Sequence, residues 1–167
     1  VRNLQRVIVW GRDPRKSAAL VAKLSDLPIE LGIATDLPTA LSAADIICSA
    51  TMARAPLILG RFVAPGTHVD LVGSFTPEMR EADTELFRRG RAFVDSDTAL
   101  KESGDIAVPL QEGVLAGPIP DLTDLLRLTA RGRSREDEIT IFKSVGTGLA
   151  DLAAARHVLE RYRARHA

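Results

Sequence analysis

The sequence predicts an α/β protein whose core is a doubly wound parallel β-sheet. Short apolar runs rich in β-branched residues alternate with segments of helical periodicity, as in parallel sheets covered by helices. No internal repeat or low-complexity linker interrupts this alternation. The 167 residues are enough for one domain with a sizeable core.

The expected strands are the apolar runs bounded by turn residues. The run "DIICSAT" lacks polar alternation, so we expect this strand to be fully buried. Its cysteine, Cys48, is the only one in the chain and is expected to be a buried thiol, which fits a reducing cytosol. The complete set of expected strands is 6–11, 29–35, 45–51, 67–73, 91–96 and 138–146.

The expected helices fill the intervals between these strands. Pro14 is compatible with the first turn of a helix, and Gly90 marks a helix end. The last helix is long and amphipathic, and its basic end complements the helix dipole. The complete set of expected helices is 14–27, 37–44, 76–90, 98–104, 121–132 and 147–167.

Composition and charge limit the classes of partner. Lys plus Arg and Asp plus Glu both number 22, so the formal net charge is +0, and no basic stripe with interleaved aromatics suggests a nucleic acid. No apolar run reaches membrane length, and the three histidines lack metal-ligand spacing. We therefore expect a cytoplasmic protein that binds no nucleic acid, membrane or metal.

One motif that this fold class usually carries does not occur in the chain. A dinucleotide-binding sheet normally opens with a strand and a G-x-G-x-x-G turn. In the usual strand order that strand lies between the second and fourth strands, so a sheet without it would have a gap. We therefore expect the chain to be a fragment of a longer protein; the alternative is an α/β fold of another kind.

Ligands of open α/β sheets bind beyond the carboxyl ends of the strands. In this chain the expected strand ends lie near Gly11 and Arg12, near Thr51, near Gly73 and near Ser144. These positions are the candidates for a binding site.

Four segments, in this order, resemble the ornithine cyclodeaminase/mu-crystallin family, and "EITIFKSVG" in the last is the most specific. The resemblance implies a partial Rossmann-like dinucleotide-binding domain over 1–144. It also implies a C-terminal helix over 145–167 that returns to a substrate and dimerisation domain, and a homodimeric intact protein. The family's first strand, glycine turn and carboxylate-binding Arg and Lys would lie outside this chain. The four segments are 44–58, 64–81, 93–106 and 137–155.

The loop after Gly73 separates the lyases of this family from its reductases. Cyclodeaminases carry an aspartate two residues after the matching glycine, whereas this chain has Ser74 and then Phe75. A phenyl ring cannot transfer a proton. The loop instead resembles the members that reduce Δ1-pyrroline-2-carboxylate or Δ1-piperideine-2-carboxylate. Phe75 would then pack against the imine ring; the alternative is an ordinary core or interface residue.

The residues after the first expected strand indicate which nucleotide, NADPH or NADH, the protein prefers. NAD-specific sites place an acid at the end of the second strand of the fold, where this chain has Gly11 and Arg12. A guanidinium can pair with a 2′-phosphate, which favours NADPH, with NADH as the alternative. The alternative is that this segment binds no nucleotide and is simply the solvated start of a helix that Asp13 caps.

The remaining site residues follow from the resemblance and from strand ends. Asp105, in "ESGDI", is the candidate catalytic acid, with a turn or helix cap as the alternative. Glu81 is expected in the first turn of its helix and Lys143 on the surface. Phe75 and Val145 are expected to face the substrate. The expected cofactor contacts are Arg12, Thr51, Val72, Gly73, Ser74 and Ser144.

Together these features favour an NAD(P)H-dependent ketimine reductase that converts a cyclic imine carboxylate to L-proline or L-pipecolate. Three alternatives stay open at this point. They are an ornithine cyclodeaminase, an alanine dehydrogenase, and a non-catalytic NADPH- and ligand-binding protein of mu-crystallin type.

Overall fold

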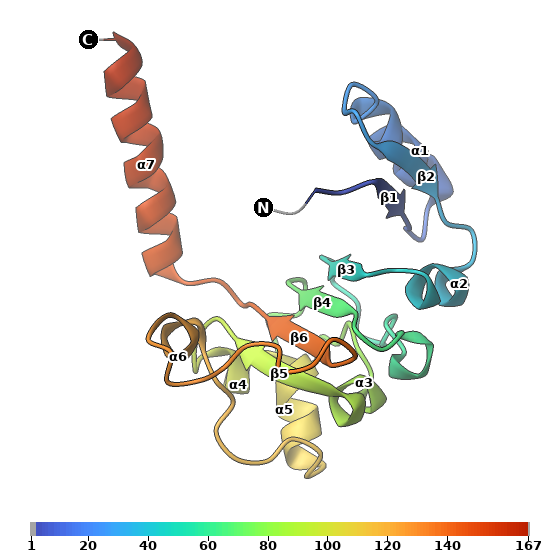
Figure 1. Cartoon of the computed structure of the whole chain (residues 1–167), viewed down its shortest axis with the longest axis vertical. Helices are drawn as coiled ribbons and strands as arrows, with labels where there is room; N and C mark the ends of the chain where they lie inside the picture. Colours follow the sequence, from blue (N-terminus) through green and yellow to red (C-terminus); the bar gives the residue numbers. More distant parts are fainter. Residues whose placement is uncertain (1–2, 167) are drawn as a thin grey trace. The chain divides into compact units, whose positions relative to one another are not determined.

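The computed structural model describes residues 3–166 of the chain. They form two compact units, which divide between Ala44 and Asp45 (Figure 1). Strands and helices alternate along both units, as the sequence predicts.

The first unit is a small strand–helix–strand–helix arrangement. Its strands β1 (Arg6–Val9) and β2 (Glu30–Ile33) pair in parallel. Its helices are α1 (Pro14–Lys23) and α2 (Leu37–Ser42). Asp13 caps α1 as expected, because its side chain accepts a hydrogen bond from the backbone N–H of Arg15. Asp36 caps α2 in the same way through Thr39.

The second unit is built on a four-stranded sheet with the order β3-β4-β6-β5, in which all neighbours are parallel (Figure 1). The carboxyl ends of parallel strands lie at the same edge of a sheet, so the loops after these strands leave from one edge. The strands are β3 (Ile46–Ser49), β4 (His68–Leu71), β5 (Gly90–Val94) and β6 (Ile139–Lys143).

Helices cover this sheet and complete the core. Helix α3 contacts β5 and α5, and α4 contacts α5. Fully buried apolar side chains, among them Val69, Leu86 and Ile141, fill the interior, and burying each contributes roughly 1.5–3 kcal/mol. The helices are the 3₁₀ turn η1 (Gly60–Phe62), α3 (Thr84–Arg89), α4 (Ala99–Glu102), α5 (Gly104–Gln111), α6 (Leu122–Leu126) and α7 (Gly148–His166).

The helix expected over 76–90 is much shorter than predicted. Only Thr84–Arg89 is helical, because Asp83 caps the helix through the N–H of Leu86, at 3.0 Å. The residues before it pair their backbone groups with distant segments. The N–H of Arg80 donates to Ala53 O at 2.8 Å, and Glu81 O accepts from residues 57 and 58. These bonds replace the bonds that a helix would make within itself.

Strand β3 also differs from the prediction. Its side chains alternate between exposed and buried, Ile46 is 40% exposed and Cys48 is exposed. The expectation of a fully buried strand with a buried thiol is therefore wrong. Successive side chains of a strand point to opposite faces, and here Ile46 and Cys48 share an exposed face while Ile47 and Ser49 share a buried one.

Helix α7 confirms the expected long C-terminal helix and its basic end, which carries Arg163, Arg165 and His166. All of its described side chains are exposed in this structure. The expected division of the chain into 1–144 and 145–167 stays a prediction. Between residues 3 and 166, no helix is both long and apolar enough to span a membrane.

Candidate functional site

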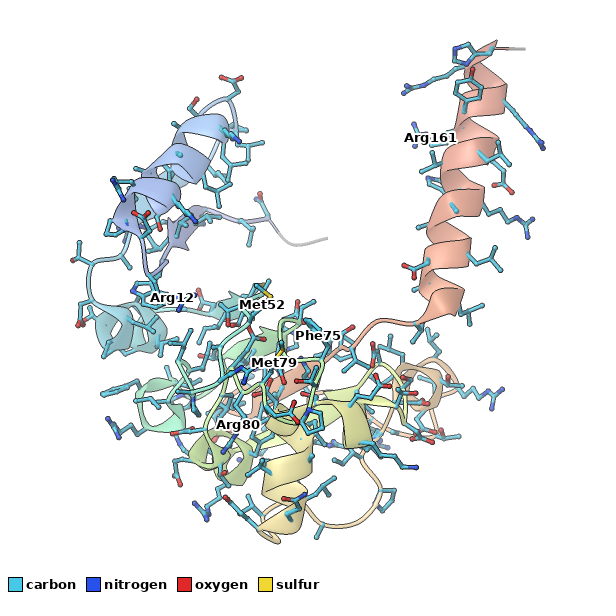
Figure 2. All side chains as sticks on the ribbon, turned by 180° about the vertical axis from the view of Figure 1, so that it is seen from behind. Arg12, Met52, Phe75, Met79, Arg80 and Arg161 are labelled. Atoms are coloured by element: carbon cyan, nitrogen blue, oxygen red, sulfur yellow. The ribbon has the colours of Figure 1, made fainter. Side chains whose placement is uncertain are left out.

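Three loops leave the carboxyl edge of the second unit's sheet, and they carry most of the predicted site residues. Thr51 follows β3, Gly73 and Phe75 follow β4, and Ser144 follows β6. The parallel register therefore brings together positions that are far apart in sequence. Figure 2 labels Met52 and Phe75, which project from the first two of these loops. Arg12 belongs to the other unit.

A buried carboxylate, Glu81, joins the loops after β3 and β4. Its side chain is fully buried, and Oε1 accepts hydrogen bonds from the Ser49 hydroxyl at 2.7 Å and from Thr51. Thr51 donates both its backbone N–H, at 2.5 Å, and its hydroxyl, at 2.8 Å. The second oxygen, Oε2, accepts the backbone N–H of Gly73 at 2.7 Å. The sequence predicts Glu81 in the first turn of a helix, and this prediction is wrong. Glu81 lies instead between the ends of two strands.

Gly73 permits the close approach of these two loops. A Cβ atom at this position would overlap the backbone N and O of Thr51 and Oε1 of Glu81. Only a residue without a side chain fits there. The glycine is thus required by packing against the neighbouring loop.

The residues beside Gly73 point in different directions. Ser74 is fully buried, and its hydroxyl donates to Met79 O at 2.6 Å and lies 2.8 Å from the Ser103 hydroxyl. Because Ser74 is fully buried, its predicted contact with a cofactor stays a prediction. Val72 and Phe75 are 46% and 48% exposed, so Phe75 is not a core residue. Its role toward a substrate stays a prediction.

Asp105 lies beneath Glu81. Its side chain is fully buried, and Oδ1 accepts the backbone N–H of Glu81 at 2.7 Å and of Ala82 at 3.0 Å. Asp105 is the second residue of α5, a helix that the sequence pattern did not predict and that Ser103 caps. The proposed catalytic role of Asp105 stays a prediction, and its carboxyl group is enclosed by protein.

Lys143 is the cation that faces Asp105. Its Nζ lies 3.8 Å from Asp105 Oδ2 and donates a hydrogen bond to Leu71 O at 3.0 Å. Burial raises the pKa of Asp105 and lowers the pKa of Lys143, although the opposite charge of each partner opposes the shift. The expectation of a surface lysine is wrong, because Lys143 ends β6, which lies between β4 and β5, and is fully buried.

A second carboxylate, Asp95, holds the loop after β6. Its Oδ2 accepts the hydroxyl of Ser144 at 2.7 Å and the backbone N–H groups of Val145 and Gly146 at 2.9 and 2.8 Å. Gly146 has a φ of 85°, a left-handed conformation that favours glycine. The loop that carries the predicted contacts Ser144 and Val145 is thus shaped by a residue from the end of β5.

In the first unit, Arg12 lines a hollow together with Gly11, Asp13 and Lys16, with a volume of about 430 Å³. Arg12 is exposed, and neither Arg12 nor Lys16 forms an ion pair with any residue between 3 and 166. The carboxylate of Asp13 pairs with Arg15 at 3.3 Å. The hollow therefore presents two cations that have no protein anion as partner.

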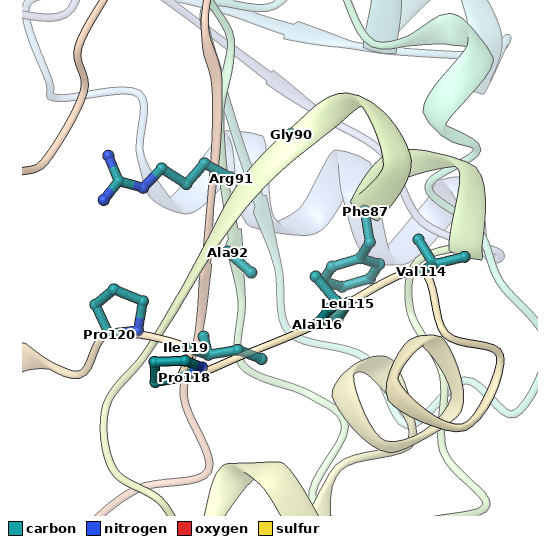
Figure 3. Close-up of a pocket in the computed structure, with 10 residues that line it drawn as sticks. All are labelled: Phe87, Gly90, Arg91, Ala92, Val114, Leu115, Ala116, Pro118, Ile119 and Pro120. Carbon is teal, nitrogen blue, oxygen red and sulfur yellow. The ribbon is translucent and has the colours of Figure 1, made fainter.

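Another hollow, of about 410 Å³, lies beside the start of β5, away from the strand-end loops (Figure 3). None of the predicted site residues lines it. Its lining residues are Phe87, Gly90, Arg91, Ala92, Val114, Leu115, Ala116, Pro118, Ile119 and Pro120. Among residues 3–166 no cluster of His, Cys, Asp or Glu could hold a metal ion.

The contacts that Glu81, Asp95 and Lys143 make in this arrangement were not predictable from the sequence. The partners of Glu81 are 8 to 32 residues away in sequence, and those of Asp95 are 49 to 51 residues away. Such distances leave no local pattern. The one available signal was the position of Asp95 and Lys143 near the ends of expected strands.

Known proteins are similar to this chain in both sequence and fold. The chain is 45% identical over 158 residues to Delta(1)-pyrroline-2-carboxylate reductase of Paracoccus denitrificans, covering 93% of this chain and 50% of that protein. It is 33% identical over 161 residues to ketimine reductase mu-crystallin of Mus musculus, covering 96% and 48%. The chain thus spans about half the length of the curated relatives it matches.

Solved structures agree with these relatives. The Delta(1)-pyrroline-2-carboxylate reductase of Thermococcus litoralis, in complex with NADH and L-proline, gives a TM-score of 0.83 at 34% identity, covering 87% of this chain and 46% of that one. The iminosuccinate reductase of Paracoccus denitrificans, in complex with NAD+, gives 0.89 at 26% identity, covering 99% and 51%. The fold is accordingly the Rossmann-like α/β fold that the sequence predicts. Residues 1–166 match the model of the ornithine cyclodeaminase/mu-crystallin family, and the chain belongs to that family.

Proposed function

We propose that this protein is an NAD(P)H-dependent ketimine reductase. It reduces Δ1-pyrroline-2-carboxylate or Δ1-piperideine-2-carboxylate to L-proline or L-pipecolate. The observation that carries the proposal is Phe75, which is 48% exposed on the loop after β4. Cyclodeaminases of the family place a proton-transferring aspartate there. A phenyl ring can instead pack against the apolar face of a cyclic imine.

The strand-end loops fit a nucleotide cofactor. No described residue accepts a hydrogen bond from the backbone N–H of Met52 or Phe75, and both residues are exposed, so these donors are available to a ligand. Backbone donors at the carboxyl edge of a parallel sheet are suited to phosphate and carboxamide oxygens. Their positions depend on the contact between Gly73 and Thr51, which a side chain at Gly73 would prevent.

The hollow around Arg12 supports a preference for NADPH, with NADH as the alternative. Arg12 and Lys16 both line it, and neither has an ion-pair partner among the described residues. A 2′-phosphate would supply such a partner, whereas the bare ribose of NADH would not.

The reaction forms a C–H bond at C2 of the imine and an N–H bond at its nitrogen. A bound nicotinamide dinucleotide would supply the hydride. The proton would come from water or from an acid of the protein. Asp105 stays the candidate acid, and its full burial means that it could act only through other groups.

The test is turnover of Δ1-pyrroline-2-carboxylate by the purified protein with NADPH and with NADH. We expect one NADPH consumed for each proline formed. Replacing the unpaired arginine, in Arg12→Ala, should raise the KM for NADPH about tenfold and change that for NADH little. Arg15→Ala is the matched control, since Arg15 already pairs with Asp13.

Other outcomes would identify a different activity. Ammonia and proline formed from ornithine, without net nucleotide consumption, would show a cyclodeaminase. Conversion of pyruvate and ammonia to alanine would show an alanine dehydrogenase. Nucleotide binding with no turnover of any imine would show a binding protein of mu-crystallin type.

We further propose a homodimer in the cytoplasm. Exposed apolar side chains on α7, including Leu149, Leu152 and Tyr162, support burial of this helix in the intact protein. Sedimentation equilibrium of the purified protein and fractionation of the cells that make it test the two parts of this proposal.

A further inference from the structure

Glu81 is the group on which the loops after β3 and β4 converge. Its two oxygens accept four hydrogen bonds in all, three on Oε1 and one on Oε2. Each carboxylate oxygen offers about two lone-pair positions, so Oε1 has no acceptor capacity left, and Oε2, which accepts one bond, is enclosed by protein. Its side chain is also fully buried. Glu81 therefore does not touch the reacting atoms.

The backbone of Glu81 is held as firmly as its side chain. Its N–H donates to Asp105 Oδ1 at 2.7 Å, and its carbonyl accepts the N–H groups of Leu57 and Ile58 at 2.9 and 2.8 Å. Asp105 itself faces Lys143. The carboxylate is thus presented to the two loops from a fixed support.

This support has an effect on the groups that remain free. The N–H of Met52 follows Thr51 directly, and the N–H of Phe75 comes two residues after Gly73. Because Glu81 binds Thr51 and Gly73, it sets the direction of the free donors that come after them in each loop. The two strand ends are therefore coupled through one carboxylate.

We propose that Glu81 is a positioning residue that orients the cofactor-binding donors of both loops and makes them act as one preformed site. The inference rests on the proposed nucleotide-dependent function and adds the residue that determines cofactor affinity at the sheet edge. Glu81 acts through Thr51 and Gly73. Asp105 acts one step further away, because it holds the backbone of Glu81.

Glu81→Gln should remove the contact of this side chain with the loop after β4 and keep its contact with the loop after β3. A glutamine has the same shape but only one acceptor oxygen. Its oxygen can keep the three donors of Ser49 and Thr51, and its amide nitrogen then faces the N–H of Gly73, which loses its acceptor. The loop after β4 is released while the loop after β3 stays in place.

The control is Asp83→Asn. The Asp83 carboxylate also accepts two backbone N–H groups, from Gly60 at 2.8 Å and Leu86 at 3.0 Å. It lies two residues from Glu81 but caps α3, and its carboxylate binds neither Thr51 nor Gly73. It therefore reports the general effect of weakening a carboxylate that binds backbone.

The test is calorimetric titration of the purified protein with NADPH and with 2′,5′-ADP. The second probe carries the adenosine phosphates but no nicotinamide half, so the contacts predicted for it lie on the Arg12 side. Glu81→Gln should weaken NADPH binding about tenfold and leave 2′,5′-ADP within about twofold. Asp83→Asn should leave both affinities within about twofold. A purely structural defect would not distinguish the two probes.

The inference is overturned if Glu81→Gln binds NADPH as tightly as the wild type, or if it weakens both probes equally. Should this variant fail to fold, Ser49→Ala removes a single hydroxyl donor from Glu81 and applies the same test, with an expected loss for NADPH of about threefold. Equal effects of Ser49→Ala on both probes would also overturn the inference. A wild-type protein that binds neither probe overturns the proposed function, and this inference with it.

Discussion

Two carboxylates shape the carboxyl edge of the sheet, and they do so in different ways. Glu81 is fully buried, uses both oxygens and joins the loops after β3 and β4. Asp95 is half-buried and uses only Oδ2 for the donors of one loop, 144–146. Its Oδ1 is buried without a hydrogen-bond partner among the described residues.

The two carboxylates therefore differ in function: Glu81 couples the positions of two loops, and Asp95 fixes the shape of one. A carboxylate that binds two strand ends makes the position of each depend on the other, whereas one that binds a single loop only shapes that loop. The interior around Glu81 also contains the charges of Asp105 and Lys143, both fully buried. Disturbing Glu81 should therefore affect the whole unit, and disturbing Asp95 should affect one segment.

The largest effect is expected for Glu81→Ala. This change leaves the hydroxyl of Ser49, both donors of Thr51 and the N–H of Gly73 without their acceptor. We expect a loss of about 4 kcal/mol in the free energy of unfolding, because buried donors that lose their partner retain their desolvation cost. Urea denaturation measures it. A loss no larger than that of Asp95→Ala would remove the distinction between the two carboxylates.

A smaller effect is expected when the support of Glu81 is changed. Lys143→Met removes a buried cation and leaves Asp105 as an unpaired buried acid, which should cost roughly 3 kcal/mol. The carbonyl of Leu71 keeps a partner, because it also accepts the N–H of Ser144 at 3.0 Å.

A double-mutant cycle provides the control. If Asp105 and Lys143 interact as the 3.8 Å distance indicates, Lys143→Met combined with Asp105→Asn should cost less than the sum of the single changes. Strictly additive losses would show that the two buried charges do not stabilise each other.

Asp95→Ala should have a modest and local effect. We expect a loss of about 1.5 kcal/mol, because Asp95 is only half-buried and water can replace part of its contacts. Hydrogen exchange should show reduced protection of the amides of Val145 and Gly146, which lose their acceptor, and no change at Thr51 or Gly73. Faster exchange at Gly73 would mean that the two carboxylates belong to one network.

The smallest effect is a dependence of stability on pH that arises from Asp105. Its pKa is raised from 3.8 by burial, so above pH 3.8 the unfolded chain loses a proton that the folded protein still holds. Stability from this group therefore falls as the pH rises through 3.8, and it levels off above the raised pKa.

Asp105→Asn removes this titration. Relative to the wild type, the variant should gain stability as the pH rises from the acid side to neutral. Urea denaturation at several pH values checks the sign. A difference between the two proteins that does not vary with pH would contradict the raised pKa.

The sequence was sufficient for the features that depend on neighbouring residues. The strands near Val69 and Ile141 were found because apolar runs between turn residues predict buried strands. Asp13 was found as a helix cap because its donor is only two residues away. Strand β3 was placed correctly, but its burial was not, since burial depends on what covers the strand.

The site itself was predicted only in outline. Thr51, Gly73 and Ser144 were placed at strand ends because position along a strand can be inferred from the sequence. The surroundings of these residues could not, because Glu81 and Asp105 bind groups that chain folding brings from other segments. The expected helix over 76–90 failed for the same reason, since its backbone groups bind residues 53, 57 and 58.

The sequence by itself determined the family, the alternation of strands and helices, and the absence of a carboxylate at Phe75. Each of these can be inferred from a local sequence pattern or from the identity of a single residue. Only the tertiary structure decided that Glu81 joins two loops, that Lys143 is buried against Asp105 and that Cys48 is exposed. Those features arise from distances between residues remote in sequence, and a parallel sheet sets such distances only when its strands have paired.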